Sequence, residues 1–255
     1  MRRKTHNYQQ EIFWDKIATK RDNEGYRSPE YPALKEMKDF FQFFGARKND
    51  RILEVGCGTG RYTLPLLQKG CAVHGTEISA GSLKSLQKQA KDLGVQKKLT
   101  VKKDALEDPK KSQTYAGKFN KALMVAVIHH FDPAKRGQIF ENIVNSLKKG
   151  GEVTALEPNP LNPFYYCLYF YRWLFNKQGV NRWSTETGML FTNIINLKRL
   201  YAQAGLKQIE IKRYAFFPSA AGRYFPVFLK INDYITNTPF LREFSAYIWI
   251  KGRKP

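Results

Sequence analysis

The sequence has few cysteines, few histidines and few acidic residues, and each shortage excludes something. The three cysteines, Cys57, Cys71 and Cys167, lie far apart and form no CxxC pair, so a zinc site and a disulfide framework are both disfavoured. Only four histidines occur, and two of them are adjacent, which argues against a metal cluster. We therefore expect no metal and a reducing compartment.

Long apolar runs are also missing. Residues 1–10 are polar and basic and lack the apolar stretch of a signal peptide. The most apolar run, residues 164–175, is interrupted by Arg172 and is much shorter than the roughly 20 residues that span a bilayer. These features predict a cytoplasmic protein and leave open a peripheral contact with the inner face of the membrane.

The charge is strongly one-sided, with 43 Lys and Arg against 22 Asp and Glu and a formal net charge of +21. Such an excess predicts attraction to anions, such as RNA phosphates or an anionic membrane surface. A soluble protein from an organism with a basic proteome explains it equally well. The length of 255 residues and the apolar share of 42% allow one large domain with a sizeable core.

Strand-like and helix-like segments alternate from residue 51 to residue 156. Strands are predicted at residues 51–55, 72–76, 99–101, 119–128 and 152–156, and helices at 61–68, 79–93 and 133–147. This alternation predicts βαβ units, a parallel sheet and a doubly wound architecture. In such a sheet, ligands bind beyond the carboxyl ends of the strands.

A glycine-rich segment, Glu54-Val55-Gly56-Cys57-Gly58-Thr59-Gly60, lies directly between the first strand and the following helix. Glycines there allow a sharp turn and a closer approach of a ligand than any Cβ permits. The helix that follows presents free N–H groups. A dinucleotide-binding loop reads GxGxxG, whereas here the third glycine comes one residue early, which counts against a nicotinamide dehydrogenase.

This segment resembles motif I of the class I methyltransferases that use S-adenosylmethionine (SAM), in which an acidic residue and any residue precede GxGxG. Residues 147–151, Leu-Lys-Lys-Gly-Gly, and the pair Glu157-Pro158 also resemble the pattern of that family. The resemblance covers roughly residues 50–158. It implies a Rossmann-like, doubly wound, mostly parallel seven-stranded sheet with an antiparallel last strand. We predict that residues 245–251 pair antiparallel with residues 208–214.

The resemblance also implies a single methyltransferase domain over residues 1–255, with SAM as cofactor and S-adenosylhomocysteine as product. We expect a helical extension or lid at 1–48, with Tyr8, Trp14 or Tyr26 near the mouth of the site. The SAM-binding core then covers 49–158, and acceptor-side insertions cover 159–192 and 215–242. Residues 193–214 and 243–255 complete the sheet.

The expected cofactor-binding residues follow from these positions. Glu77 ends the strand after motif I, where a carboxylate can accept two hydrogen bonds from a ribose diol. Asp104 follows the third strand and is expected near the adenine amino group, although a turn cap is its plain structural alternative. The segment from Met124 to His130 is expected to back the methionine part of SAM. The full set is Glu54, Gly56, Cys57, Gly58, Gly60, Tyr62, Glu77, Ile78, Asp104, Ala105, Val125 and Ala126.

Methyl transfer from a sulfonium is an in-line displacement with an activated donor, so position and alignment matter most. A general base is needed only where a proton of the acceptor must leave. His130 and His129 are the candidates, since imidazole titrates near neutral pH, and His130 is favoured. Glu157 is a candidate for orienting the acceptor, and Asp132 reads as a helix cap. Packing in the loop is the alternative role for both histidines.

Aromatic residues gather in residues 164–183 and 216–228, beside arginine and lysine. This mixture suits a water–lipid interface, stacking on single-stranded bases, or a lid over an apolar pocket. We predict a methyltransferase that acts on a small-molecule or lipid-like acceptor. A tRNA wobble-uridine methyltransferase, which residues 126–131 with Lys135 and Arg136 resemble, and a non-catalytic SAM-binding module are the alternatives. The oligomeric state stays open.

Overall fold

The computed structural model describes residue 15 and residues 33–167, 187–217 and 227–255. The expected positions of Tyr8, Trp14 and Tyr26 lie outside these residues, as does much of the two aromatic stretches. None of the helices in the described part combines the length and the apolarity that crossing a bilayer requires.

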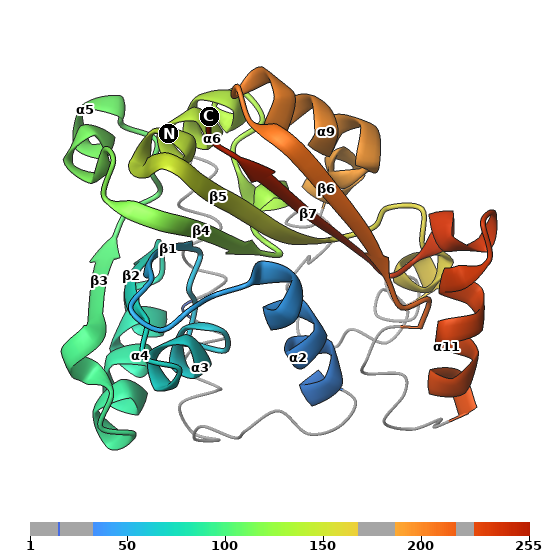
Figure 1. Cartoon of the computed structure of the whole chain (residues 1–255), viewed down its shortest axis with the longest axis horizontal. Coiled ribbons are helices and arrows are strands. Elements are labelled where there is room, and N and C mark those ends of the chain that lie inside the picture. Colours follow the sequence, from blue (N-terminus) through green and yellow to red (C-terminus); the bar gives the residue numbers. More distant parts are fainter. Residues whose placement is uncertain (1–14, 16–32, 168–186, 218–226) are drawn as a thin grey trace, which may run out of the picture.

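Seven strands form one sheet in the order β3-β2-β1-β4-β5-β7-β6 (Figure 1). The first five strands pair in parallel, and β7 pairs antiparallel with both β5 and β6. The predicted fold and the predicted place of the last strand are therefore confirmed. The strands are β1 (Arg51–Val55), β2 (Ala72–Glu77), β3 (Leu99–Lys103), β4 (Phe119–Val125), β5 (Leu147–Pro158), β6 (Lys207–Tyr214) and β7 (Tyr247–Arg253).

Helices cover both faces of the sheet. One face carries α2 (Ala33–Phe44), α3 (Thr63–Gln68) and α4 (Ala80–Asp92), and the other carries α6 (Arg136–Ser146) and α9 (Ile194–Gln203) (Figure 1). Central strands are buried on both sides, as a parallel sheet requires. Trp249 of β7 is fully buried and packs edge-on against Phe40 of α2. Helix α2 is thus part of the core rather than a loose extension.

Short elements connect these layers. They are η1 (Gln96–Lys98), α5 (Pro109–Ser112), η2 (Gln113–Tyr115), η3 (Ile128–His130), η4 (Thr187–Thr192) and η5 (Leu241–Phe244). A further helix, α11 (Val227–Asn237), lies in the stretch 215–242, which is expected to be an acceptor-side insertion and for which no helix is predicted.

Strand β4 ends three residues earlier than its apolar run predicts. Ala126 has a positive φ of 54°, and η3 follows. The backbone N–H groups of Val127 and Ile128 donate to the carboxylate of Glu157 instead of a neighbouring strand, at 2.9 and 2.8 Å. The Glu157 side chain on β5 therefore takes the hydrogen bonds that a longer β4 would make with a neighbouring strand. The chain leaves the sheet there, at its carboxyl edge.

Candidate functional site

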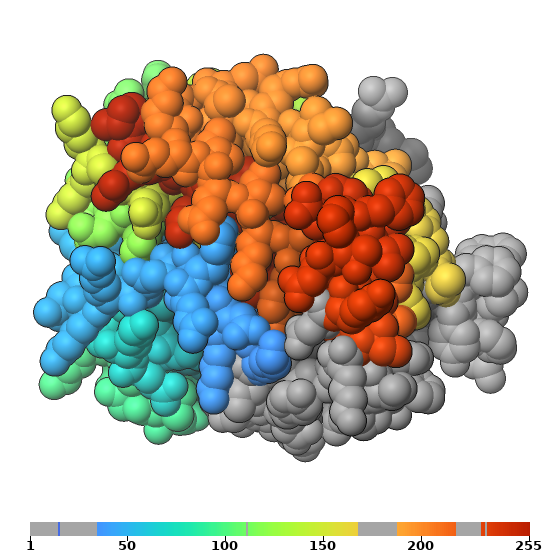
Figure 2. All heavy atoms as spheres, turned by 45° about the vertical axis from the view of Figure 1, so that its right-hand side comes forward, coloured from blue at the N-terminus to red at the C-terminus, as the bar shows by residue number. Residues whose placement is uncertain are grey.

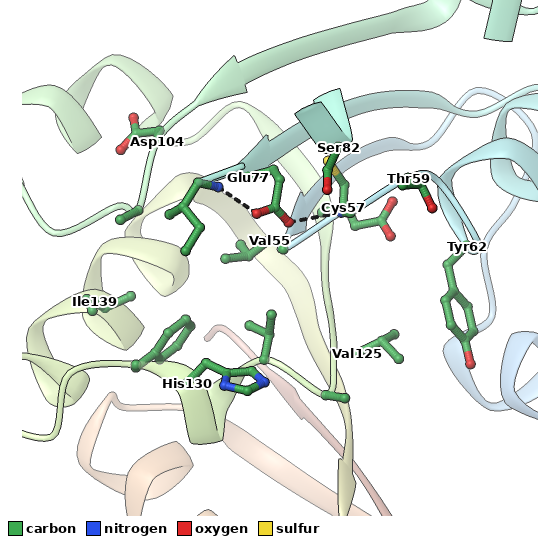
Figure 3. A pocket seen from close by; sticks show the side chains of 18 of the residues that line it. Val55, Cys57, Thr59, Tyr62, Glu77, Ser82, Asp104, Val125, His130 and Ile139 are labelled. Atoms are coloured by element: carbon green, nitrogen blue, oxygen red, sulfur yellow. Dashed lines mark hydrogen bonds between the residues drawn. The ribbon is translucent and has the colours of Figure 1, made fainter. Parts of the chain in front are cut away.

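A cavity of about 260 Å³ lies at the carboxyl ends of β1, β2 and β4 (Figure 3). All but one of the expected cofactor-binding residues line it. The exception is Gly60, where a Cβ would lie 2.5 Å from Leu86 Cδ1, so this glycine serves the packing of α4. The lining residues that were expected are Glu54, Gly56, Cys57, Gly58, Tyr62, Glu77, Ile78, Asp104, Ala105, Val125, Ala126 and His130.

The first two glycines of motif I have different roles. A Cβ on Gly56, whose φ is +71°, would lie 2.1 Å from Val127 Cγ2, so Gly56 lets the loop after β1 pack against the loop after β4. Gly58 also has a positive φ, +51°, but a Cβ there would meet nothing within 4 Å. Because Gly58 lines the cavity, the space beside it is available to a ligand.

The Glu77 carboxylate is held by the backbone. Oε1 accepts hydrogen bonds from Ile78 N at 2.7 Å and Ser79 N at 2.9 Å, and Oε2 accepts one from Gly58 N at 3.0 Å (Figure 3). Burial raises the pKa of Glu77, and these three donors oppose that rise. The fixed carboxylate keeps further acceptor capacity toward the cavity, as a diol would need.

Glu54 lies deeper in the same cavity. Burial raises its pKa to about 8, the Thr63 hydroxyl that donates to it at 2.6 Å opposes the rise, and the charge of Glu77 adds to it. Glu54 is therefore protonated at neutral pH until a cation comes close.

Both carboxylate oxygens of Asp104 already accept hydrogen bonds within the protein. Its Oδ1 accepts from Leu106 N at 2.8 Å and its Oδ2 from the Tyr115 hydroxyl at 3.2 Å. Both the expected turn cap and a place in the cavity wall are thus present in one residue.

The wall opposite Glu77 follows β4 and includes His130 (Figure 3). Phe131, Ile139 and Val127 make this wall largely apolar. Val127 belongs to the segment 124–130 that the sequence places beside SAM, whereas Phe131 and Ile139 were not singled out as cavity residues. An apolar residue in α6 or in the loop before it fits a core equally well, and only the topology brings these two to the cavity.

His129 and Glu157 do not line the cavity. Both are buried, at 3% and 0% exposure, and His129 Nδ1 lies 2.7 Å from Glu157 Oε2. Glu157 Oε1 accepts hydrogen bonds from Val127 N and Ile128 N. All hydrogen bonds of the Glu157 side chain in the described structure are therefore made with the loop after β4. The carboxylate of Glu157 is enclosed and positions the loop that carries His130, and its expected role in orienting the acceptor stays a prediction.

Element η4 packs directly on η3. A Cβ on Gly188 would lie 1.8 Å from the backbone oxygen of His129, so only glycine permits this contact. We predict that Gly188→Ala lowers the free energy of unfolding by about 1–3 kcal/mol, the usual cost of overpacking. Denaturant unfolding measures it. Gly137→Ala in α6, where a Cβ meets nothing within 4 Å, is the matched control and should be neutral or stabilising. Equal effects of the two variants would contradict the packing argument.

The charge of the cavity is opposite to that of the chain. Five carboxylates line it, those of Glu54, Glu77, Asp104, Glu107 and Asp132, against a single arginine or lysine, Arg61. Glu107 is paired with Lys135 at 2.6 Å. Asp132 accepts from Ala134 N at 3.0 Å in the turn before α6, whose N-cap residue is Lys135, so the prediction that Asp132 caps the helix is wrong. Among the described residues, no group of three or more potential ligands is placed to hold a metal ion.

Comparison with known proteins agrees with this geometry. Residues 52–151 match the family model of a methyltransferase domain. These residues, about two fifths of the chain, form a methyltransferase domain. The match covers β1 to the start of β5 and thus the strands that carry the motif I loop, Glu77, Asp104 and His130.

Two curated relatives show how widely the acceptors of similar proteins differ. The 23S rRNA (uracil(1939)-C(5))-methyltransferase RlmD of Shewanella sediminis is 30% identical over 107 residues, 42% of this chain but only 22% of that protein. The ubiquinone biosynthesis O-methyltransferase of Ruegeria sp. is 26% identical over 176 residues, 66% of this chain and 64% of that protein. The rRNA relative is therefore matched over less than a quarter of its own length.

Solved structures share the fold. The [4+2]-cyclase SpnF has a TM-score of 0.64 at 17% identity, covering 97% of this chain and 96% of its own. Magnesium protoporphyrin IX methyltransferase ChlM from Synechocystis, solved with bound S-adenosylhomocysteine, has a TM-score of 0.60 at 13% identity, covering 98% and 100%. At these identities the likeness concerns the fold alone.

Proposed function

We propose that this methyltransferase transfers the methyl group of SAM to a small, uncharged and largely apolar acceptor, of the lipid-like type. The observation that carries the proposal is one cavity with two unlike walls. One wall has the Cβ-free Gly58 and the fixed carboxylate of Glu77, and the other has His130 among apolar side chains.

The residues present fit SAM. Glu77 is the ribose ligand, Asp104 and Ala105 lie beside the expected adenine position, and Gly58 leaves room that a side chain would fill. Glu54 supplies a carboxylate for the cationic part of the ligand. When bound, SAM supplies a methyl group already activated on a sulfonium.

On the acceptor side, the chain supplies alignment, exclusion of water and one titratable group. Val127, Phe131 and Ile139 provide an apolar surface, and His130 provides an imidazole that can take a proton from an acceptor hydroxyl or ring position. His129 and Glu157 hold that loop in place from behind.

The carboxylates of the cavity argue for an uncharged acceptor. Glu54 is protonated before a cation binds and Glu107 is paired with Lys135, but Glu77, Asp104 and Asp132 still outnumber Arg61. The resulting negative local potential favours a cationic donor and opposes an anionic acceptor. An RNA methyltransferase is the second candidate because of the similarity to the rRNA enzyme. The polyanionic backbone of RNA would have to pass these carboxylates, so we rank it second. A SAM-binding module without catalysis is the third.

The test uses SAM labelled in its methyl group and a cell extract that is afterwards split into lipid, RNA, protein and polar fractions. We expect label in the organic phase, in a product that an anion exchanger does not retain. His130→Phe should lower the transfer rate by about 10²-fold or more while leaving SAM affinity unchanged. Glu77→Ala should instead abolish SAM binding. Label in RNA would select the second candidate, and tight SAM binding without transfer would select the third.

A further inference from the structure

Exposed apolar side chains are concentrated at one end of the molecule. Eight large hydrophobic side chains are exposed in the described part of the chain, and seven of them lie on segments at the carboxyl end of the sheet. The eighth, Leu93, follows α4 at the opposite end. The seven are Leu161, Tyr166, Leu190, Ile195, Ile231, Tyr234 and Phe240.

Five of these side chains lie on segments that hydrogen bonds join to one another. We call Leu161, Tyr166, Ile231, Tyr234 and Phe240 the apolar end. They lie on residues 159–167, on α11 and next to η5, which lie side by side in Figures 1 and 2. Tyr234 and Phe240 are each 72% exposed.

Hydrogen bonds of buried asparagines hold these segments against the chain just after β6 and just before β7. Asn159 Nδ2 donates to the backbone oxygens of Glu243 and Ser245, each at 2.8 Å. Asn162 Nδ2 donates to the oxygens of Phe216 and Phe244 at 2.8 and 2.7 Å. Asn232 of α11 accepts from the N–H groups of Phe216 and Phe217. The apolar side chains are therefore held outward on a fixed support.

On α11 the anchoring and the exposed residues take different faces. Asn232 is buried, whereas Ile231 and Tyr234, three residues apart on one face of the helix, are exposed. Tyrosine and aliphatic side chains on one face of a helix suit the boundary between water and acyl chains.

The sequence of the segments around this end contains more basic than acidic residues. In sequence, residues 159–193 and 215–246 carry six basic and three acidic residues. One of those acids, Glu243, is paired with Arg213 at 2.6 Å. Residues 159–167 and 187–195 have no charged side chain. An apolar surface on a chain of net charge +21 fits a bilayer that contains anionic lipid.

We propose that the apolar end is a membrane-contact surface that holds the cavity end of the molecule against an anionic phospholipid bilayer. Residues 159–167 continue from β5, whose neighbour β4 leads into the His130 wall of the cavity, so the surface and the acceptor wall share one end of the sheet. The role of the bilayer as the source of an apolar acceptor rests on the proposed function; binding to the bilayer does not.

The opposite end of the molecule is the competing surface. Twelve basic residues lie near the amino ends of the strands and at the end of β7, where the nearby acids are Asp50, Asp92 and Glu152. This end has only Leu93 as an exposed large hydrophobic among the described residues. Binding there would be purely electrostatic. Its basic residues are Arg47, Lys48, Arg51, Lys69, Lys97, Lys98, Lys118, Lys148, Lys149, Lys207, Arg253 and Lys254.

The test is flotation of the full chain with vesicles of phosphatidylcholine alone or mixed equally with phosphatidylglycerol. We expect binding to the mixed vesicles that partly survives about 1 M salt, where the screening length is about 3 Å. The triple variant Ile231→Ser, Tyr234→Ser, Phe240→Ser should bind these vesicles about tenfold more weakly or worse. Leu93→Ser is the matched control and should bind as the unaltered chain does.

Several outcomes would overturn the proposal. Two concern variants: unchanged vesicle binding by the triple variant, or loss of vesicle binding in the double variant Lys148→Glu, Lys149→Glu. The other two are binding of the unaltered chain to RNA but to neither kind of vesicle, and a dimer of the unaltered chain that becomes a monomer in the triple variant. SAM binding is measured on every variant. Its retention in the triple variant shows an intact fold, and its absence from the unaltered chain would count against the proposed function without affecting the vesicle result.

Discussion

Glu157→Ala is expected to lower the free energy of unfolding by about 3–5 kcal/mol, because three donors lose their acceptor at about 1–3 kcal/mol each. Glu157 is fully buried and accepts hydrogen bonds from two backbone N–H groups and from His129. Alanine leaves all three donors unsatisfied in the core, and each such group carries a desolvation penalty. Denaturant unfolding with and without the substitution measures the loss.

Two comparisons make this expectation specific. Glu157→Gln keeps an oxygen for Val127 N and Ile128 N, so it should cost less than half as much as alanine. Glu210→Ala removes an exposed partner of Lys251, at 57% exposure, and should change stability by about 0.5 kcal/mol or less. In the glutamine variant methyl transfer should fall more than SAM affinity, because His129 loses its acceptor. A cost of under about 1 kcal/mol for alanine would show that the loop after β4 does not depend on Glu157.

The cofactor half of the site follows from the sequence because its determinants are local. The order of strand, glycine loop and helix fixes where Gly58 lies, and Glu77 lies at the end of the next strand, which pairs with the first. Parallel strands bring their carboxyl ends to one edge, so two residues about 20 positions apart share a ligand without any information on side-chain packing.

The acceptor half does not follow in the same way. Glu157 and His129 are 28 positions apart, and nothing local shows that the carboxylate turns back into the protein rather than toward the cavity. Gly188 carries no visible signal at all, although its missing Cβ decides how closely η4 approaches His129. These choices depend on contacts between distant segments, and the apolar residues around them have the same pattern in a core and in a pocket.

Glu54 gives the second large effect, a dependence on pH. Burial raises its pKa to about 8 in the folded chain, against an ordinary value of 4.5. Between these values the native state holds a proton that the unfolded state has lost, so unfolding free energy falls as pH rises, by at most about 1.4 kcal/mol per unit. The contribution of protonated Glu54 to the free energy of unfolding is complete below the pKa of the unfolded state and is lost as the pH rises toward 8. Glu54→Gln keeps the acceptor for Thr63 and should remove this slope.

SAM binding should have the opposite pH dependence. A cationic ligand in the cavity favours the ionised carboxylate, so binding near neutral pH expels the proton of Glu54. We expect the affinity of the unaltered chain, relative to Glu54→Gln, to rise by up to about tenfold per pH unit from pH 6 to 8 and then to level off. The α-amino group of SAM also titrates near pH 8, but it affects both proteins and cancels in the ratio. Calorimetry in buffers of different ionisation enthalpy detects the released proton directly at pH 7. A constant ratio with no proton release would mean that Glu54 stays protonated in the complex and acts as a hydrogen-bond donor instead of a counter-charge.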